Sequence, residues 1–402
     1  MIIEVWKQGG AWVVKQYLII YLLAFGGFLV GTAEMMIAGI LDLIADDFRI
    51  AVGLAGQSVT AYALVFAIGT PILIAASSRI ERRTLLLIAY AVFIAGNIAA
   101  FASSSFGWFM LSRAVLAAGA GVIVVVSLTV GARLAPPDRR GSAIGTVIMG
   151  FSLALVLGVP LGALIGDLSG WRTNFALLAA LAFLLWIALW RLIPSSGADE
   201  PVPPGRQLSS LRDAKTVSGL LVTLFWIAGY QLVFTYLSPL LRTSAGIDTA
   251  MVSTALLVCG LFSVAGSRLG GYGADRWGTA RTITFSLLTH AAALVVLPFA
   301  SVSIIGALAV LAVWFGSAWT TTPAQQYYLV SISPGAADFV LSLNNSILQL
   351  GIAIGAAAGG LIAELSSVRQ LGWAGAAAEL LALLAAAYSF SRIARTAESP
   401  RL

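Results

Sequence analysis

The sequence predicts an all-α membrane protein, with twelve transmembrane helices in two six-helix halves related by pseudo-two-fold symmetry. Three observations lead to this fold class. Hydrophobic residues make up 59% of the 402 residues and charged residues only 10%, whereas an average soluble domain has about 25% charged residues. Twelve apolar runs each reach the length of about 20 residues that a helix needs to cross a bilayer. The third observation is an internal repeat, described below.

The predicted spans follow one another with short polar loops between them. The first apolar run is too long for the hydrophobic region of a cleavable signal peptide, so we expect it to remain in the membrane. In chain order the expected spans are 17–41, 53–76, 84–102, 105–130, 141–166, 173–193, 215–240, 250–272, 281–301, 303–330, 338–362 and 370–391.

The loops predict the orientation of the chain. Eighteen Lys and Arg residues fall in loops and termini on one side of the membrane, and four fall on the other. Cytoplasmic loops carry the excess of positive charge, so both termini are expected in the cytoplasm, in a bacterial inner membrane. The same bias explains the net charge of +6, so we expect no nucleic-acid partner and a lipid bilayer instead.

An internal repeat divides the chain. A shift of 197 residues places Gly69 on Gly266, Arg79 on Arg276 and Gly158 on Gly355, and one shift that aligns loops and helices together indicates duplication. The run at 194–204, rich in Pro, Ser and Gly, is typical of a linker. We therefore expect an N-terminal half at 1–193, a cytoplasmic linker at 194–214 and a C-terminal half at 215–402.

A loop motif after the eighth predicted span resembles a known family. Residues 271–281 read Gly-Tyr-Gly-Ala-Asp-Arg-Trp-Gly-Thr-Ala-Arg, similar to the G-x-x-x-D-R-x-G-x-x-R motif of major facilitator transporters, which also consist of six plus six helices. The resemblance implies a conformational latch at the cytoplasmic face. It would be formed by Asp275, Arg276, Gly278 and Arg281.

The corresponding loop of the first half departs from this motif. It carries Arg79 and Glu81, but Ser78 stands where the family has Asp. The sequence Arg-Ile-Glu-Arg-Arg is similar to that of the branch containing arabinose, purine and chloramphenicol efflux proteins. Glu81 could replace the missing carboxylate only if the loop bends differently.

The first and fourth spans carry the candidates for proton coupling. Glu34 lies about 17 residues into its span, where an unpaired charge is costly and a function is the default expectation. Burial there favours the protonated form, as a proton carrier requires. Arg113 in span four also needs a partner, and Asp42 is a third candidate nearer the outer surface. The resemblance of the sequence around Glu34 to the G-T-x-E pattern of efflux proteins implies proton coupling.

The fifth span contains a glycine stripe that permits close helix approach. It comprises Gly150, Gly158, Gly162 and Gly166, with Pro160 expected to kink the helix, and it resembles the signature of proton-coupled antiporters. Ordinary membrane packing is the other interpretation. Span eleven repeats the stripe at Gly355 and Gly359, so we expect the two stripes at a central interface between the halves.

The second half is expected to supply the substrate cavity. The shift maps Glu34 onto Gln231, so the acidic position is not duplicated. Amides and aromatic rings inside apolar spans favour a hydrated cavity or hydrogen bonds between helices, although packing is the usual role of an aromatic ring. The candidate cavity residues are Tyr230, Gln231, Phe234, Tyr236, Trp319, Gln326, Asn344, Asn345 and Gln349.

These features predict a proton-coupled efflux antiporter for a small organic solute. The solute could be a drug, a sugar or a nucleoside-like compound. Uptake by symport or facilitated diffusion is the alternative within transport, and a non-transporting sensor or scaffold is the alternative of another class. No GxxxxGK[ST], HExxH or CxxC pattern occurs, so we expect no enzyme activity, no metal and no cofactor besides the proton. We expect a monomer. His290 and Glu379 receive no assigned role.

Overall fold

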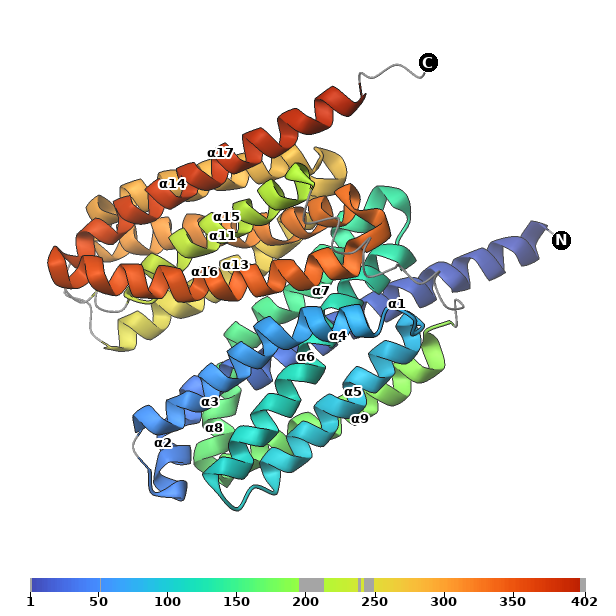
Figure 1. The fold of residues 1–402 in the computed structure, drawn as a ribbon, viewed down its shortest axis with the longest axis horizontal. Helices are drawn as coiled ribbons and strands as arrows, with labels where there is room; N and C mark the ends of the chain where they lie inside the picture. The colour runs from blue at the N-terminus through green and yellow to red at the C-terminus, as the bar shows by residue number, and fades with distance from the viewer. Residues whose placement is uncertain (1, 51, 195–212, 238–239, 242–248, 398–402) are drawn as a thin grey trace. The chain divides into compact units, whose positions relative to one another are not determined.

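The computed structural model describes residues 2–50, 52–194, 213–237, 240–241 and 249–397. Every regular element in these ranges is a helix. The chain divides into two compact units, Met1–Val202 and Pro203–Leu402, and each unit is described by itself (Figure 1). Most of the predicted linker, 195–212, lies outside the described residues.

The first unit contains six membrane-crossing segments built from shorter elements. Its helices in chain order are α1 Ile2–Met35, α2 Ile37–Phe48, α3 Val52–Leu64, η1 Val65–Gly69, α4 Thr70–Ala76, α5 Arg82–Phe101, α6 Phe106–Leu134, η2 Pro137–Arg139, α7 Arg140–Leu153, η3 Ala154–Gly158, α8 Val159–Ser169 and α9 Arg172–Leu192.

The second unit has longer, less interrupted helices. They are α11 Ala214–Phe234, α13 Thr249–Arg276, α14 Thr279–Ala300, α15 Ile304–Ile332, η5 Pro334–Ala336, α16 Ala337–Leu365, η6 Val368–Gln370 and α17 Leu371–Ala397. Eleven helices in the described chain are long and apolar enough to cross a membrane. The predicted span 250–272 corresponds to α13, whose 28 residues supply the twelfth long helix.

Three predicted spans of the first unit are not continuous α-helices. Span one ends its first helix at Met35 and restarts at Ile37. Spans two and five each contain a five-residue π-helical turn, η1 and η3. Each π turn stands directly before a proline at the start of the next helix, Pro71 or Pro160. Proline has no N–H to donate and its ring crowds the preceding turn, so a wider turn accommodates it.

Within each unit, a few helix pairs form most of the packing. In the first unit α6 packs against α5, α5 against α9, and α1 against α7. In the second unit α15 packs against α13 and α14, while α11 lies against α16 and α17, and α17 also reaches α14 (Figure 1). α6 is the most enclosed of the candidate spans, since 83% of its most apolar stretch is buried. It therefore forms the centre of the first unit.

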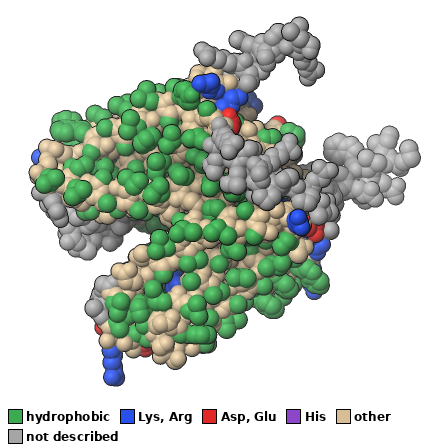
Figure 2. Space-filling model, in the orientation of Figure 1, with side chains coloured by type: hydrophobic (Ala, Val, Ile, Leu, Met, Phe, Trp, Pro, Cys, Tyr) green, Lys and Arg blue, Asp and Glu red, His purple; other side chains and the backbone are tan. Residues whose placement is uncertain are grey.

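The outer surfaces of the helices are apolar. Figure 2 shows hydrophobic side chains spread along both units, with most Lys, Arg, Asp and Glu side chains gathered towards helix ends. Large side chains such as Leu168, Phe285, Ile305 and Leu365 are exposed. A soluble protein rarely exposes so many, whereas lipid chains provide an apolar solvent for them.

Arginine side chains join the ends of the first unit's helices. At one end, Arg172 of α9 lies 2.6 Å from Asp47 Oδ2 and donates to the carbonyl of Ser103, so α2, the α5–α6 loop and α9 meet there. At the opposite end, Arg139 donates to Tyr17 Oη at 2.7 Å. The two ends of the first unit therefore carry the loops that are predicted to lie on opposite faces of the membrane.

Candidate functional site

Arg113 is the charged group most deeply enclosed in the first unit. Its side chain on α6 is fully buried, and Nη1 donates to the carbonyl of Ala33 in α1 at 2.8 Å. The guanidinium carbon lies 4.4 Å from the ring centroid of Tyr62 in α3, a cation–π contact that is strengthened where water is absent. Arg113 Nε and Nη2 and Tyr62 Oη have no hydrogen-bond partner among the described residues. Buried donors without partners are rare, and each is available to an acceptor that enters the site.

Glu34 belongs to the same cluster. It follows Ala33, whose carbonyl binds Arg113, and its carboxyl group interacts electrostatically with both Arg113 and Tyr62. The Glu34 side chain is only partly buried. The structure thus brings together two of the three residues predicted for coupling. The side chain of Asp42, the third, lies outside the described residues, although its backbone belongs to α2.

Tyr62 was not predicted as a site residue. A single Tyr in an apolar run is usually a packing residue, and only the fold places its ring over the guanidinium. The sequence signal available was weak: an intramembrane Arg needs partners, and aromatic rings are among the partners that suit it.

The glycine stripe of the fifth span packs against the first span of the same unit. A Cβ atom on Gly158 would collide with Thr32 Oγ1, and one on Gly162 would lie 2.9 Å from Met36 Cβ. At Gly150 it would collide with the carbonyl oxygen of Ala24. These glycines therefore form a seam inside one unit, and the expected interface between the halves stays a prediction.

The second unit repeats this seam. A Cβ on Gly355 of α16 would collide with the carbonyl oxygen of Ala228 in α11, and one on Gly359 would lie 2.6 Å from the carbonyl oxygen of Leu232. Gly355 and Gly359 are the repeat counterparts of Gly158 and Gly162. The duplicated sequence thus produces the same contact, between the first and fifth spans of each unit.

Several predicted cavity residues are held by contacts within the second unit. Gln231 Nε2 donates to Thr235 Oγ1 on its own helix at 3.0 Å. Tyr236 Oη donates to the carbonyl of Ala356 at 3.1 Å and its ring covers the Gly359 position. Gln349 is half-buried.

The predicted amides of spans ten and eleven lie near a hydrogen-bonded cluster. Asn344 Oδ1 accepts from Thr223 Oγ1 at 2.7 Å, and Gln325 Nε2 donates to the carbonyl of Gly219 at 2.6 Å and to Thr223 at 3.2 Å. Thr223 and Gln325 were not predicted, although the Gln325-Gln326 pair was visible in the apolar run. Gln326 and Asn345 are buried, and Gln326 Oε1 and Asn345 Nδ2 have no partner among the described residues.

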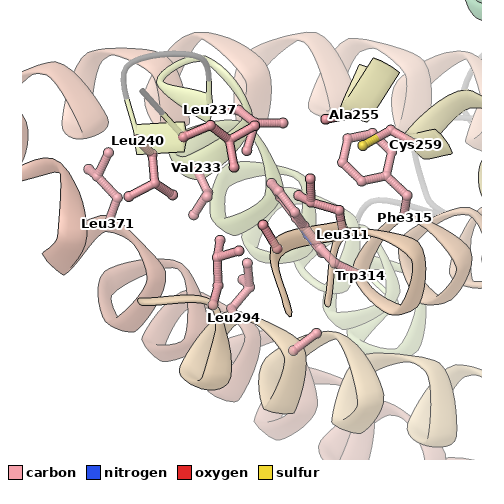
Figure 3. Close-up of a cluster of buried hydrophobic side chains, with 14 of the residues drawn as sticks. Val233, Leu237, Leu240, Ala255, Cys259, Leu294, Leu311, Trp314, Phe315 and Leu371 are labelled. Atoms are coloured by element: carbon pink, nitrogen blue, oxygen red, sulfur yellow. The ribbon is translucent and has the colours of Figure 1, made fainter. Parts of the chain in front are cut away.

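An aromatic cluster surrounds Tyr230. Its ring centroid lies 5.4 Å from those of Phe234 and Trp314, 5.5 Å from that of Phe315, and 6.2 Å from that of His290. Trp319 packs against the same group. Figure 3 shows Trp314 and Phe315 among the buried apolar side chains of this region. Tyr230, Phe234 and Trp319, predicted as cavity residues, therefore lie together.

His290 and Glu379 form a buried pair next to this cluster. His290 Nδ1 lies 3.1 Å from Glu379 Oε1, and both side chains are 0% exposed. Trp314 Nε1 donates to His290 Nε2. No sequence pattern indicates this pairing, because the two residues lie on α14 and α17 and nothing in a single sequence relates them.

The predicted latch motif of the second unit forms the turn between α13 and α14. Arg276 ends α13, and Gly278 caps the start of α14 with φ of 86°, which only glycine adopts readily. Asp275 is half-buried and Arg276 and Arg281 are exposed. In the first unit, Thr84 Oγ1 donates to Glu81 Oε2 at 3.2 Å, at the N-terminal end of α5. Arg79 is exposed.

Comparison with known proteins gives consistent results. A sequence model described as "Major Facilitator Superfamily" matches residues 23–347. The uncharacterized MFS-type transporter YbcL of Bacillus subtilis is 40% identical over 372 residues, covering 92% of this chain and 95% of YbcL. The inner membrane transport protein YdhP of Escherichia coli is 29% identical over 340 residues, covering 85% of this chain and 87% of YdhP.

A solved structure shows the same fold. The fucose:proton symporter FucP of Escherichia coli superimposes with a TM-score of 0.75 at 14% identity, covering 93% of this chain and 99% of FucP. At that identity the likeness extends to the arrangement of helices and not to the substrate.

Proposed function

Because this chain belongs to the major facilitator superfamily and has its twelve-helix fold, we propose that it exports a small organic solute in exchange for protons. It is a membrane transporter and not an enzyme, and members of this family typically need no cofactor. We further propose that it works as a monomer in a bacterial inner membrane. The direction of transport, the proton coupling and the roles of the individual residues below are proposals too.

The observation that carries the proposal is the cluster of Glu34, Arg113 and Tyr62. A partly buried carboxyl group beside a fully buried guanidinium has two states that differ by a full charge. When Glu34 is ionised, it neutralises Arg113. When Glu34 is protonated, Arg113 is left uncompensated and favours an anionic or polar group from elsewhere. A solute or a conformational change can respond to that difference.

We assign the coupled proton to Glu34, with Arg113 as its charge partner. The halves 1–193 and 215–402 are proposed to rock against one another around a substrate site, with Asp275 and Arg276 contributing to a cytoplasmic latch. Tyr230, Phe234, Trp319, Gln326 and Asn345 are proposed as solute contacts of the second half, since the two amides carry buried atoms without partners. Efflux rests on the resemblance of span five to proton-coupled antiporters, whereas FucP is a symporter.

The test uses purified protein in proteoliposomes. A thermal-shift screen with arabinose, inosine, chloramphenicol and tetraphenylphosphonium first selects a compound that binds. Vesicles holding the labelled compound are then given an inward proton gradient, acidic outside, and release is measured.

We expect the gradient to accelerate release at least tenfold in the wild type and to have no effect on Glu34→Gln, which keeps the shape of a protonated carboxyl group. Asp46→Asn removes an exposed carboxylate and serves as the matched control. Retention driven by the same gradient would show symport instead, and an unchanged response in Glu34→Gln would remove the assignment of the proton.

A further inference from the structure

The geometry points to a second proton-binding site, at Glu379 in the C-terminal unit. The ligand is a single proton, held on the carboxyl group while His290 stays neutral. This inference is independent of the coupling proposed at Glu34. It holds whether the transporter works by antiport or by symport.

Hydrogen-bond direction determines the state of His290. The indole N–H of Trp314 is a donor only, and its partner is His290 Nε2. That nitrogen must therefore offer a lone pair, so the imidazole is neutral and carries its hydrogen on Nδ1. A doubly protonated imidazole would set two N–H groups against each other. Trp314 thereby disfavours the imidazolium form.

The state of Glu379 follows from that of His290. Nδ1, the nitrogen that bears hydrogen, lies 3.1 Å from Glu379 Oε1 without hydrogen-bond geometry, and His290 is the only ion-pair partner of Glu379 in the part of the chain that the structure describes. An ionised carboxylate buried opposite a neutral imidazole would be an isolated charge, which is strongly unfavourable. One bound proton removes that charge. Glu379 is therefore the acid of the pair.

The backbone of α11 lies close to the carboxyl group at Gly229. A Cβ on Gly229 would lie 3.2 Å from Glu379 Oε1 and 2.8 Å from the carbonyl oxygen of Gly375. The backbones of α11 and α17 therefore approach closely beside the carboxyl group.

Besides His290, no basic side chain forms an ion pair with Glu379 among the described residues. Tyr230 of α11 and Cys259 of α13 belong to the same apolar cluster, and α15 contributes Trp314. Among the remaining elements packed on α17, Asp338 lies in the first turn of α16 and Arg369 of η6 is exposed. Neither forms an ion pair with Glu379 in the described chain.

Infrared spectroscopy of the purified, lipid-reconstituted protein tests the assignment directly. A protonated carboxyl group has a carbonyl stretch that a carboxylate lacks, and labelling with ¹³C-glutamate shifts it if it belongs to Glu. We expect such a band in neutral buffer in the wild type, lost in Glu379→Gln and kept in Glu34→Gln and Asp46→Asn. A wild-type spectrum without any protonated-Glu band, or one unchanged in Glu379→Gln, would overturn the proposal.

Thermal unfolding gives a second readout that needs no transport. If the folded state holds a proton that the unfolded state releases, stability falls as pH rises. While the folded state keeps the proton and the unfolded state has released it, the unfolding equilibrium constant grows about tenfold per pH unit. We expect Glu379→Gln to lose that slope and Glu34→Gln to keep it. Equal slopes in the wild type and Glu379→Gln would contradict the site. If Glu379→Gln does not accumulate, the labelled wild-type band decides.

Discussion

At the scale of single residues, Arg113 shows how a cation is accommodated inside an apolar helix bundle. It contacts the carbonyl of Ala33, the ring of Tyr62 and the charge of Glu34. The carbonyl fixes its position, the ring accepts its face, and the carboxylate balances its charge. Two guanidinium nitrogens still lack partners among the described residues, so the site is not fully satisfied in this state.

This arrangement predicts that Arg113 and Glu34 are energetically coupled. Removing one charge leaves the other without compensation, whereas removing both does not. We expect Arg113→Leu alone to lower thermal stability strongly and the double variant Arg113→Leu/Glu34→Gln to recover part of the loss. The thermodynamic cycle should give a coupling energy of about 1 kcal/mol or more. Additive effects would show that the two groups do not interact.

At the scale of elements, the glycine seam brings α1 and α7 of the first unit into close contact. Gly150→Ala should be destabilising, because its Cβ would collide with the backbone carbonyl of Ala24, and overpacking typically costs about 1–3 kcal/mol. Gly107→Ala is the matched control, since nothing lies within 4 Å of a Cβ there. Thermal unfolding of both variants measures the difference. Equal stabilities would mean that α1 and α7 can separate at no cost.

Gly158→Leu extends the test from stability to function. The larger side chain would displace Thr32, two residues before Glu34, so we expect a protein that inserts but transports poorly. Vesicle counterflow measures transport, and the amount of folded protein in the membrane serves as the control. Normal transport by Gly158→Leu would show that the seam tolerates movement beside the coupling site.

The elements also show how far the sequence was predictive. Runs of apolar residues located the helices, because lipid demands length and hydrophobicity. The break at Met36 and the two π turns were not predicted, because hydropathy does not record backbone hydrogen bonding. Pro71 and Pro160 nevertheless marked where the turns would end. Glu34 and Arg113 were found because charge in a span is costly. Their partner Tyr62 and the pair of His290 and Glu379 depend on contacts between distant helices, which no local pattern records.

At the scale of the whole molecule, the alternating loops predict a definite orientation. Cys259 is the only cysteine and is fully buried, so the parent protein should not react with an impermeant maleimide in intact cells. We expect Ser104→Cys to be labelled from outside and Asp138→Cys only after the cells are opened, since both positions are exposed. Labelling of Asp138→Cys in intact cells would invert the topology and place both termini outside.

The π turn at Ala154–Gly158 carries a consequence for insertions and deletions. A π turn closes its hydrogen bonds over one more residue than an α turn does. Eight residues separate Gly150 from Gly158, which in a regular α-helix would set them about 80° apart. Counting one residue as extra brings the two glycines to within about 20°, so both face α1.

The turn therefore behaves as a stored one-residue insertion. Deleting Leu155 together with Pro160→Ala should convert η3 to ordinary α-helix and leave the glycines in line, so the protein should still fold. Deleting Val147 from α7, upstream of the turn, should instead rotate the upstream part of the helix by about 100° and abolish folding. Expression and thermal unfolding of the two deletions compare them. We thus expect span five to tolerate the deletion of one residue at the π turn and not elsewhere in the seam.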